Sequence, residues 1–149
     1  PGSNTFILAT PHEGRPYSGL CCQFAAQFAA LVIGNTIGTL RESKDPNEGA
    51  ELLKACIVET NKHLLRLSLE EDVYLDWGCN FVICNTGYPG HIVLAYVGNM
   101  GALCSSSFRP GITELIENDE DVFTFEGLGI NGNVEPLSIG IVMNRFQLQ

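Results

Sequence analysis

The stretch CNFVICNTGYPGHIVLAYV, residues 79–97, predicts two adjacent antiparallel strands. Cys79 to Asn85 and His91 to Val97 are apolar runs of strand length, and Gly87-Tyr88-Pro89-Gly90 forms a Pro/Gly turn between them. Two such runs joined by a short turn are typical of a β-hairpin. Later short apolar runs, separated by polar turns, predict that the meander continues through Ala102 to Ser105, Ile112 to Ile116, Val122 to Phe125 and Leu137 to Phe146.

The chain before this hairpin begins with a predicted strand and a predicted helix. Thr5 to Thr10 is a short apolar run closed by a turn-prone loop, which indicates a strand. From Tyr17 to about Ile33 apolar residues recur at helical spacing with little polar surface, so we expect a largely buried helix. Gly34 and Gly38 are expected to end it.

A second helix is expected from Glu48 to about Leu67, because its apolar residues form one stripe and its charged residues lie opposite. Asn47 is placed to cap its N-terminus. Helices therefore come early and strands late. This order predicts an α+β architecture, with the helices packed on a face of an antiparallel sheet.

Length and charge restrict the classes of function. A chain of 149 residues with 45% hydrophobic residues is the size of one domain, so we expect a single domain over residues 1–149, with Pro1-Gly2-Ser3 as a cloning remnant. Eight Lys and Arg against 17 Asp and Glu give a net charge of -9. Because a phosphate backbone would be repelled by this charge, nucleic acid is not expected as a partner.

Membrane insertion is not expected either. The longest apolar stretch, Leu20 to Ile33, is interrupted by Gln23 and Gln27 and falls short of the roughly 20 residues that a membrane span needs. No basic and apolar leader precedes it. The expected location is the cytoplasm.

The six cysteines are expected to be free thiols, most of them buried. Apart from Cys21, they lie inside apolar helix or strand patterns rather than in loops. The chain has no CxxC pair and no His spacing typical of a zinc site, so no structural zinc is expected.

Four segments, met in order along the chain, resemble the metal-dependent serine/threonine phosphatases of the PPM type. The strand FILA followed by Thr10-Pro11-His12-Glu13-Gly14 resembles the family's strand and Asp-Gly-His-Gly-Gly loop. LAYVGNMGALC, residues 94–104, resembles the turn Val-Gly-Asp-Ser-Arg-Ala, and NDEDVFTFEGLG, residues 118–129, resembles the acidic strand that leads to Ser-Asp-Gly-Leu. The final run from Leu137 to Phe146 is similar to the family's closing Asp-Asn-Ile-Thr strand. The resemblance implies a compact, truncated phosphatase-like sandwich of antiparallel strands with two main helices on a sheet face.

The same comparison implies that the family's two divalent metal ions are lost. In the family, carboxylates hold these ions, which lower the pKa of a bridging water and clamp the phosphate oxygens. Here Thr10 stands at the first Asp and Asn99 at the Asp of the turn, while Leu137 and Ser138 replace the final Asp-Asn pair. Only Glu126 keeps a carboxylate. His12 and Gly14 keep family positions, but no catalytic residue, metal ligand or cofactor is expected.

Other chemistries stay open at this point. Cys21 or Cys22 could act as a thiol nucleophile with His12 as its base, although cysteines at the start of an apolar helix are more often buried packing. A loop His is more often a solvated side chain than a proton carrier. An acidic cluster could pass for a calcium loop, but it lacks EF-hand spacing and is better explained as a solvated edge: Glu114, Glu117, Asp119, Glu120 and Asp121.

The leading hypothesis is therefore a pseudophosphatase that acts as a scaffold, adaptor or allosteric regulator through protein contacts. One catalytically dead member of the family binds and activates a MAP kinase kinase kinase, and this precedent implies a kinase or kinase complex as partner. Aromatic anchors dominate interface energies, so the candidate contact residues are Tyr74, Trp77, Tyr88 and Phe108, although Trp77 and Phe108 could equally fill the edge of the core. Two alternatives are an active Mg- or Mn-dependent phosphatase with ligands such as Glu126, Asp76 and Asp121, and an unrelated α+β subunit of an assembly.

Overall fold

The computed structural model of this chain describes residues 5–42, 45–70, 76–88, 90–98, 100, 102–106, 109–116, 127–130 and 136–142. Within these ranges it has two helices and six strands. The helices are α1 (Ser18–Glu42) and α2 (Pro46–Glu70). The strands are β1 (Thr5–Pro11), β2 (Cys79–Asn85), β3 (His91–Val97), β4 (Ala102–Ser106), β5 (Arg109–Ile116) and β6 (Leu137–Val142).

The predicted end of the first helix is wrong, because α1 continues through Gly34 and Gly38 to Glu42. A glycine inside a helix costs only about 1 kcal/mol relative to alanine. The helix lies along α2, β1 and β2, and this packing outweighs the two glycines. The expectation of a largely buried helix is also wrong, since full burial among the described α1 positions recurs on one face, at Ser18, Cys21, Ala25, Ala29 and Ile33.

The cap of the second helix is Asp45 rather than Asn47. Asp45 Oδ1 accepts a hydrogen bond from the backbone N–H of Asn47 at 2.9 Å, and its carbonyl accepts one from Gly49 at 3.2 Å. Pro46 then occupies the first helical position, where its missing N–H leaves no hydrogen bond unmade. Asn47 is an exposed residue of the first turn of α2.

The main sheet has the strand order β1-β2-β3-β6, and all of its pairings are antiparallel. The predicted β2–β3 hairpin is confirmed, with Phe81 opposite Val97 and Asn85 opposite Val93. The predicted continuous meander is wrong. β6 takes the place beside β3, while β4 and β5 pair with each other in a second, two-stranded sheet. The predicted strand at 122–125 and residues 143–146 of the last predicted strand lie outside the described residues.

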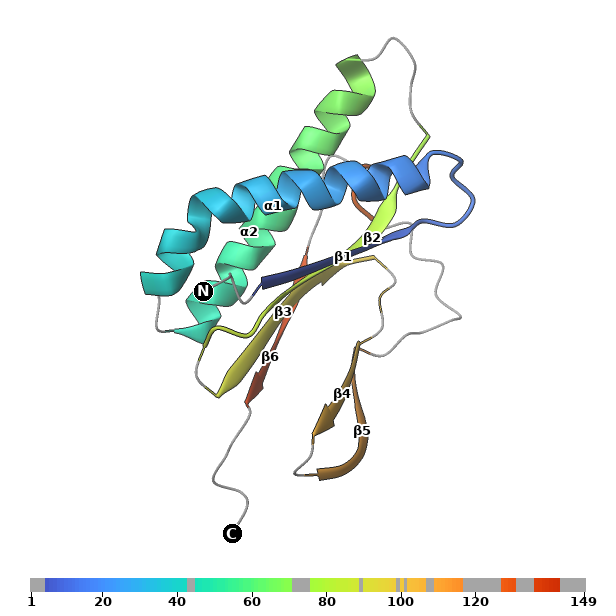
Figure 1. Cartoon of the computed structure of the whole chain (residues 1–149). Coiled ribbons are helices and arrows are strands. Elements are labelled where there is room, and N and C mark those ends of the chain that lie inside the picture. The colour runs from blue at the N-terminus through green and yellow to red at the C-terminus, as the bar shows by residue number, and fades with distance from the viewer. Residues whose placement is uncertain are drawn as a thin grey trace.

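Both helices cover one face of the main sheet, and the β4–β5 hairpin lies on the other side (Figure 1). The core fills the layer between helices and sheet with Phe81, Ile83, Val93 and Ala95 from the strands against Ala25, Ala29, Leu53, Ile57 and Leu64 from the helices. Each strand residue in this set alternates with one on the opposite face. The predicted α+β fold with two helices packed on a sheet face is confirmed.

One described helix is long and apolar enough to cross a membrane by length and composition alone, namely α1 over Ser18–Asn35. The core helix of a water-soluble protein can meet the same criterion. In the structure α1 packs one face on β1 and β2. Whether this helix spans a membrane is not tested, so its expected absence from a membrane stays a prediction.

Candidate functional site

The candidate site lies where β1 ends and β2 begins. Thr10, which the sequence resemblance aligns with the family's first metal-binding Asp, pairs with Asn80 across the two strands. The chain then leaves the sheet in a loop, which His12 ties to β2 by donating its backbone N–H to the carbonyl of Gly78 at 3.0 Å. In this way the strand pairing places the loop beside residues more than 60 positions later in the sequence.

Thr10 faces a sulfur atom rather than a set of oxygens. Its hydroxyl lies 3.7 Å from Met100 Sδ, to which it donates a weak hydrogen bond. Met100 is buried and follows β3 in the turn that resembles the metal-binding turn of the family. A hydroxyl beside a thioether offers no negative charge, and the thioether sulfur is a soft donor, whereas Mg²⁺ prefers charged oxygen ligands. Asn99, in the same turn, lies outside the described residues.

The turn at the end of β3 needs a glycine. Gly98 has a φ of +85°, which L side chains rarely adopt, and a Cβ there would overlap the Asn80 side chain. Asn80 therefore folds over the turn backbone next to Thr10. This contact, which the sequence did not indicate, sets how closely the β1 loop and the β3 turn approach each other.

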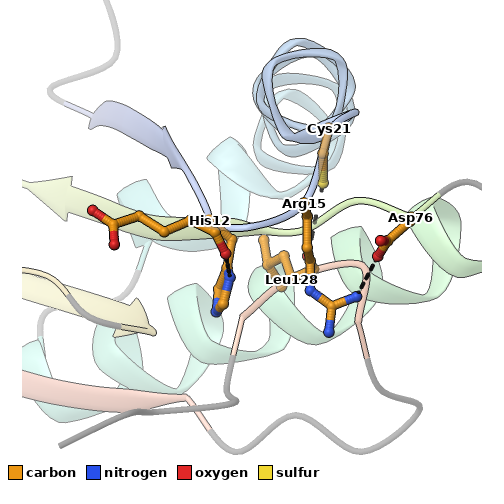
Figure 2. Close-up of polar contacts among 6 residues, drawn as sticks. His12, Arg15, Cys21, Asp76 and Leu128 are labelled. Atoms are coloured by element: carbon orange, nitrogen blue, oxygen red, sulfur yellow. Dashed lines mark hydrogen bonds and ion pairs between the residues drawn. The ribbon is translucent and has the colours of Figure 1, made fainter.

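An ion pair closes one side of the loop. Arg15 Nη1 lies 2.8 Å from Asp76 Oδ1, and both side chains are partly exposed (Figure 2). The backbone adds a second link, because Tyr17 donates its N–H to the carbonyl of Asp76 at 3.2 Å. Asp76 was a candidate ligand of the alternative metal site, and in the structure its carboxylate pairs with a guanidinium instead. Asp121 and Glu126, the other candidates, lie outside the described residues.

His12 and Gly14 have local roles in the loop. His12 Nδ1 lies 3.0 Å from the carbonyl oxygen of Glu13, which accepts a hydrogen bond from the tautomer that carries its proton on Nδ1 (Figure 2). Gly14 has a φ of +79° with no atom within 4 Å of a Cβ built on it, so it is kept for its backbone conformation. In the same view the side chains of His12, in the loop after β1, and Cys21, on α1, lie apart from each other. This view gives no support to Cys21 as a nucleophile with His12 as its base, because the two side chains would need hydrogen-bond contact.

The segment 127–130, which follows Glu126, docks against both helices and β2. Leu128 exchanges two backbone hydrogen bonds with Cys79, at 2.9 and 3.1 Å. Its carbonyl lies 3.7 Å from Cys21 Sγ on α1 (Figure 2). Asn61 Oδ1 on α2 accepts the N–H of Gly129 at 2.8 Å. Sequence reasoning missed Cys21 and Asn61 as anchors. The available signal was an uncharged polar residue within the apolar stripe of α2.

Gly129 is required where this segment meets the core. Its φ is +81°, and a Cβ there would lie 3.0 Å from Trp77 Nε1 and 3.2 Å from Cys21 Sγ. Trp77 is fully buried, and so is Tyr88 except for 5% of its surface, so the prediction that they form a contact surface is wrong. The alternative that Trp77 fills the core is confirmed. Tyr74 and Phe108 lie outside the described residues.

Three thiols gather beneath this segment. Burial raises the pKa of the Cys22 thiol, and the neighbouring Cys21 raises it further. A hydrogen bond with Cys21 raises the pKa of Cys79 well above its usual range, and burial adds to this effect. The five described cysteines are free, as predicted; three are buried, and Cys22 and Cys84 are half-buried.

These raised thiol pKa values predict that the protein loses stability in alkaline solution. Thiols of the unfolded chain ionise from about pH 8.5 upward, while those of the folded chain stay protonated. The unfolded state then binds fewer protons, so the free energy of unfolding should fall as pH rises, by up to about 1.4 kcal/mol per pH unit for Cys79. Urea unfolding under reducing conditions between about pH 7 and about pH 9.5 measures this slope. In the variant Cys22→Ser/Cys79→Ala the free energy of unfolding should depend less steeply on pH. An equal slope in both proteins would show that these thiols are not the cause of the alkaline loss of stability.

The last two family positions lie far from Thr10. Leu137 opens β6 opposite Tyr96 and is 58% exposed, and Ser138 pairs with Ala95. β6 and β1 are the two outer strands of the sheet, which separates Leu137 from Thr10 by about 14 Å at a strand spacing of about 4.8 Å. An exposed alkyl side chain at this position cannot bind a metal.

The described residues do not fit a pair of divalent metal ions. Among them no group of three or more His, Cys, Asp or Glu side chains is arranged to hold a metal. Glu114, one residue of the acidic cluster, lies on β5 opposite Leu103, while the rest of that cluster is outside the described ranges.

Comparison with known proteins identifies the fold of this chain but shows no closer relationship to any of them. No family model and no curated protein matches the sequence. Three solved structures that match in fold are the serine/threonine phosphatase Stp1 from Staphylococcus aureus (TM-score 0.72, 16% identity), the Mycobacterium tuberculosis serine/threonine phosphatase PstP/Ppp (0.67, 14%) and PppA, a regulatory component of T6SS in Pseudomonas aeruginosa (0.68, 8%). The matches cover 94%, 97% and 95% of this chain but only 60%, 65% and 61% of those proteins. The chain therefore has the fold of the PPM-type serine/threonine phosphatases over about three-fifths of their length.

Proposed function

We propose that this chain is a catalytically inactive, phosphatase-like protein that acts as a scaffold, adaptor or allosteric regulator through protein contacts. The observation that carries the proposal is the pairing of Thr10 with Met100 at 3.7 Å, at the position of the family's first metal-binding carboxylate. Without charged oxygen ligands, hard cations gain too little to offset the loss of their hydration. A water that is not metal-bound keeps a pKa far too high to attack a phosphate ester at neutral pH.

The Arg15–Asp76 ion pair supports the same proposal. A working alternative site would need Asp76 as a ligand, and this carboxylate would have to leave Arg15, 2.8 Å away, to bind a metal. The alternative of an active enzyme with unusual ligands therefore has no support from the described residues.

The partner class that we propose is a kinase or a kinase complex. This part of the proposal rests on family precedent, and the structure changes only the surface that would be used. Since Trp77 and Tyr88 are buried, the exposed large apolar residues of the sheet are the better contact candidates: Phe6, Leu8 and Leu137, with exposed fractions of 63%, 55% and 58%.

The test is a calorimetric titration with Mn²⁺ and Mg²⁺, run beside an assay with a phosphopeptide substrate. We expect no saturable binding at two sites and no metal-dependent turnover. The matched control is Asp76→Asn, which removes the charge of the alternative ligand and should leave both results unchanged. Metal-dependent turnover in the wild type that Asp76→Asn abolishes would establish the active-enzyme alternative and overturn the proposal.

A further inference from the structure

β1 is an outer strand of the main sheet, and it lacks the features that usually protect such edges. Its partner on one side is β2, and the strand order β1-β2-β3-β6 leaves its other side unpaired among the described strands. The strand TFILATP has no charged residue and pairs without a bulge, and its one proline is the last residue. Natural edge strands usually carry charges, bulges or prolines that prevent pairing with another chain. β1 is therefore open to strand addition.

The order of residues in β1 is self-complementary. In an antiparallel pair of two β1 strands with Ile7 at the two-fold axis, Phe6 of each copy lies opposite Leu8 of the other. Phe6 and Leu8 are 63% and 55% exposed, on the sheet face away from the helices, so both pairs would bury apolar surface. Aromatic–aliphatic pairs of this kind are among the favourable cross-strand contacts. A two-fold interface requires this symmetry, because the same patch must complement itself.

The helix above β1 has an uncharged outer surface. From Ser18 to Leu40 α1 contains no charged residue, although the chain as a whole has 25. Its exposed positions are small, amide or aliphatic: Gly19, Leu20, Gln23, Gln27, Ala30, Leu31, Gly34 and Asn35. Neither β1 nor this part of α1 therefore adds to the repulsion between two chains of net charge -9.

The positions of helix and strand suit each other. α1 packs on β1 and β2, running back along them from the loop (Figure 1). At a strand spacing of about 4.8 Å, two α1 helices, each centred between its own β1 and β2 and related by an axis between the paired β1 strands, would lie about 10 Å apart. Helices pack at axial distances of about 8–10 Å, and small residues permit the shorter values. The helices would thus meet when the strands pair.

The size of the surface also fits. A stable interface needs about 800 Å² per partner. β1 alone is too short, because its seven residues extend about 23 Å at 3.3 Å per residue. α1 adds a face about 37 Å long and roughly 10 Å wide, which brings the total to roughly 600 Å² per partner, the lower end of the range for stable interfaces.

We propose that two copies of this chain form a two-fold symmetric dimer in which their β1 strands pair antiparallel about Ile7 and their α1 helices pack together. The dimer deepens the proposed function, on which it rests only in taking protein contact as the role of the chain. It would leave Leu137 and the β6 edge of each copy free for a different partner.

Sedimentation velocity of the full chain over a wide concentration range tests the dimer. The wild type should sediment at twice the chain mass of 16.2 kDa, and Phe6→Lys/Leu8→Lys should weaken self-association on the order of a hundredfold, because lysines would face each other across the strands. Leu69→Lys is the matched control, since Leu69 is a more exposed apolar residue at the far end of α2, and it should change nothing. Circular dichroism verifies that each variant is folded.

Disulfide trapping tests the register, even if the lysine variant fails to fold. Ile7→Cys should give a dimer linked through residue 7 of both copies on mild oxidation, because directly opposed Cα atoms lie about 4.5–5.5 Å apart, within the range of disulfides. Thr5→Cys should not, since Thr5 faces Ala9 in this register. Mass spectrometry of the linked peptide identifies the bond.

Three results would overturn the dimer. These are a wild type that stays monomeric, a dimer that Leu137→Lys breaks while Phe6→Lys/Leu8→Lys does not, and a monomer that binds phosphatidylcholine vesicles through α1. None of these readouts depends on metal binding or turnover, so failure of the dimer and failure of the proposed inactivity are separate outcomes.

Discussion

Replacing Trp77 with alanine is expected to lower the free energy of unfolding by about 3–5 kcal/mol, the usual cost of deleting a buried large aromatic side chain. Trp77 is fully buried, with its ring centroid 6.1 Å from that of Phe24 on α1. It also lies against Gly129, where a Cβ would come within 3.0 Å of Trp77 Nε1. The variant should therefore loosen the segment 127–130 as well as the core. Urea unfolding followed by circular dichroism measures the loss, because Trp77 is the only tryptophan and cannot serve as a probe.

Trp77→Phe is the control for the size of the side chain. The indole Nε1 has no hydrogen-bond partner among the described residues, so phenylalanine gives up no bond there. We expect a cost of about 1–2 kcal/mol from the smaller ring. If phenylalanine were as damaging as alanine, a polar contact of the indole rather than its volume would be responsible.

Replacing Gly49 with alanine should destabilise the protein by about 1–3 kcal/mol, although the same change in a helix normally stabilises by about 1 kcal/mol. Gly49 lies in the first turn of α2, and the ring of Tyr88 from the β2–β3 turn packs directly on its backbone. A Cβ at this position would overlap Cε2, Cζ and OH of Tyr88, so the ring or the helix would have to move. Thermal and urea unfolding give the sign of the change.

Two matched variants isolate the contact. Gly34→Ala in α1 has open space around the new methyl group and should stabilise the protein by about 1 kcal/mol. In a Tyr88→Ala background Gly49→Ala should also become stabilising, because the ring is gone. If Gly49→Ala stabilised the protein with Tyr88 present, the close packing of ring and helix would be wrong.

The regular elements were largely predictable because their signals are local. The apolar stripe of α2 and the two runs around Gly87-Tyr88-Pro89-Gly90 each lie within one short window, and both predictions are confirmed. The errors arose where distant contacts outweigh local preference. α1 passes through two glycines because α2 and the sheet support it, and β6 rather than β4 pairs with β3.

The candidate site was predictable in its positions but not in its contacts. The order of motifs located Thr10 at the end of the first strand and His12 and Gly14 in the loop that follows, and the structure places Thr10 in β1 and the other two in that loop. The sequence did not indicate that Met100 is the neighbour of Thr10, 90 residues away, or that Arg15 is the partner of Asp76, 61 residues away. Asn61 and Cys21 were likewise invisible as anchors of Leu128 and Gly129, because no periodicity relates residues that only the fold brings together.

By itself the sequence determined the class of fold, since periodicity can be read without coordinates, and it predicts that uncharged residues, Thr10 and Leu137, stand at two of the family's metal-ligand positions. Only the tertiary structure decided which side of each element is covered. In the folded chain Trp77 and Tyr88 are buried, Phe6 and Leu8 are exposed, and Asp76 forms an ion pair with Arg15. The physical reason is that burial and pairing depend on which surfaces meet, and strand order and helix placement set those meetings through contacts between residues far apart in the chain.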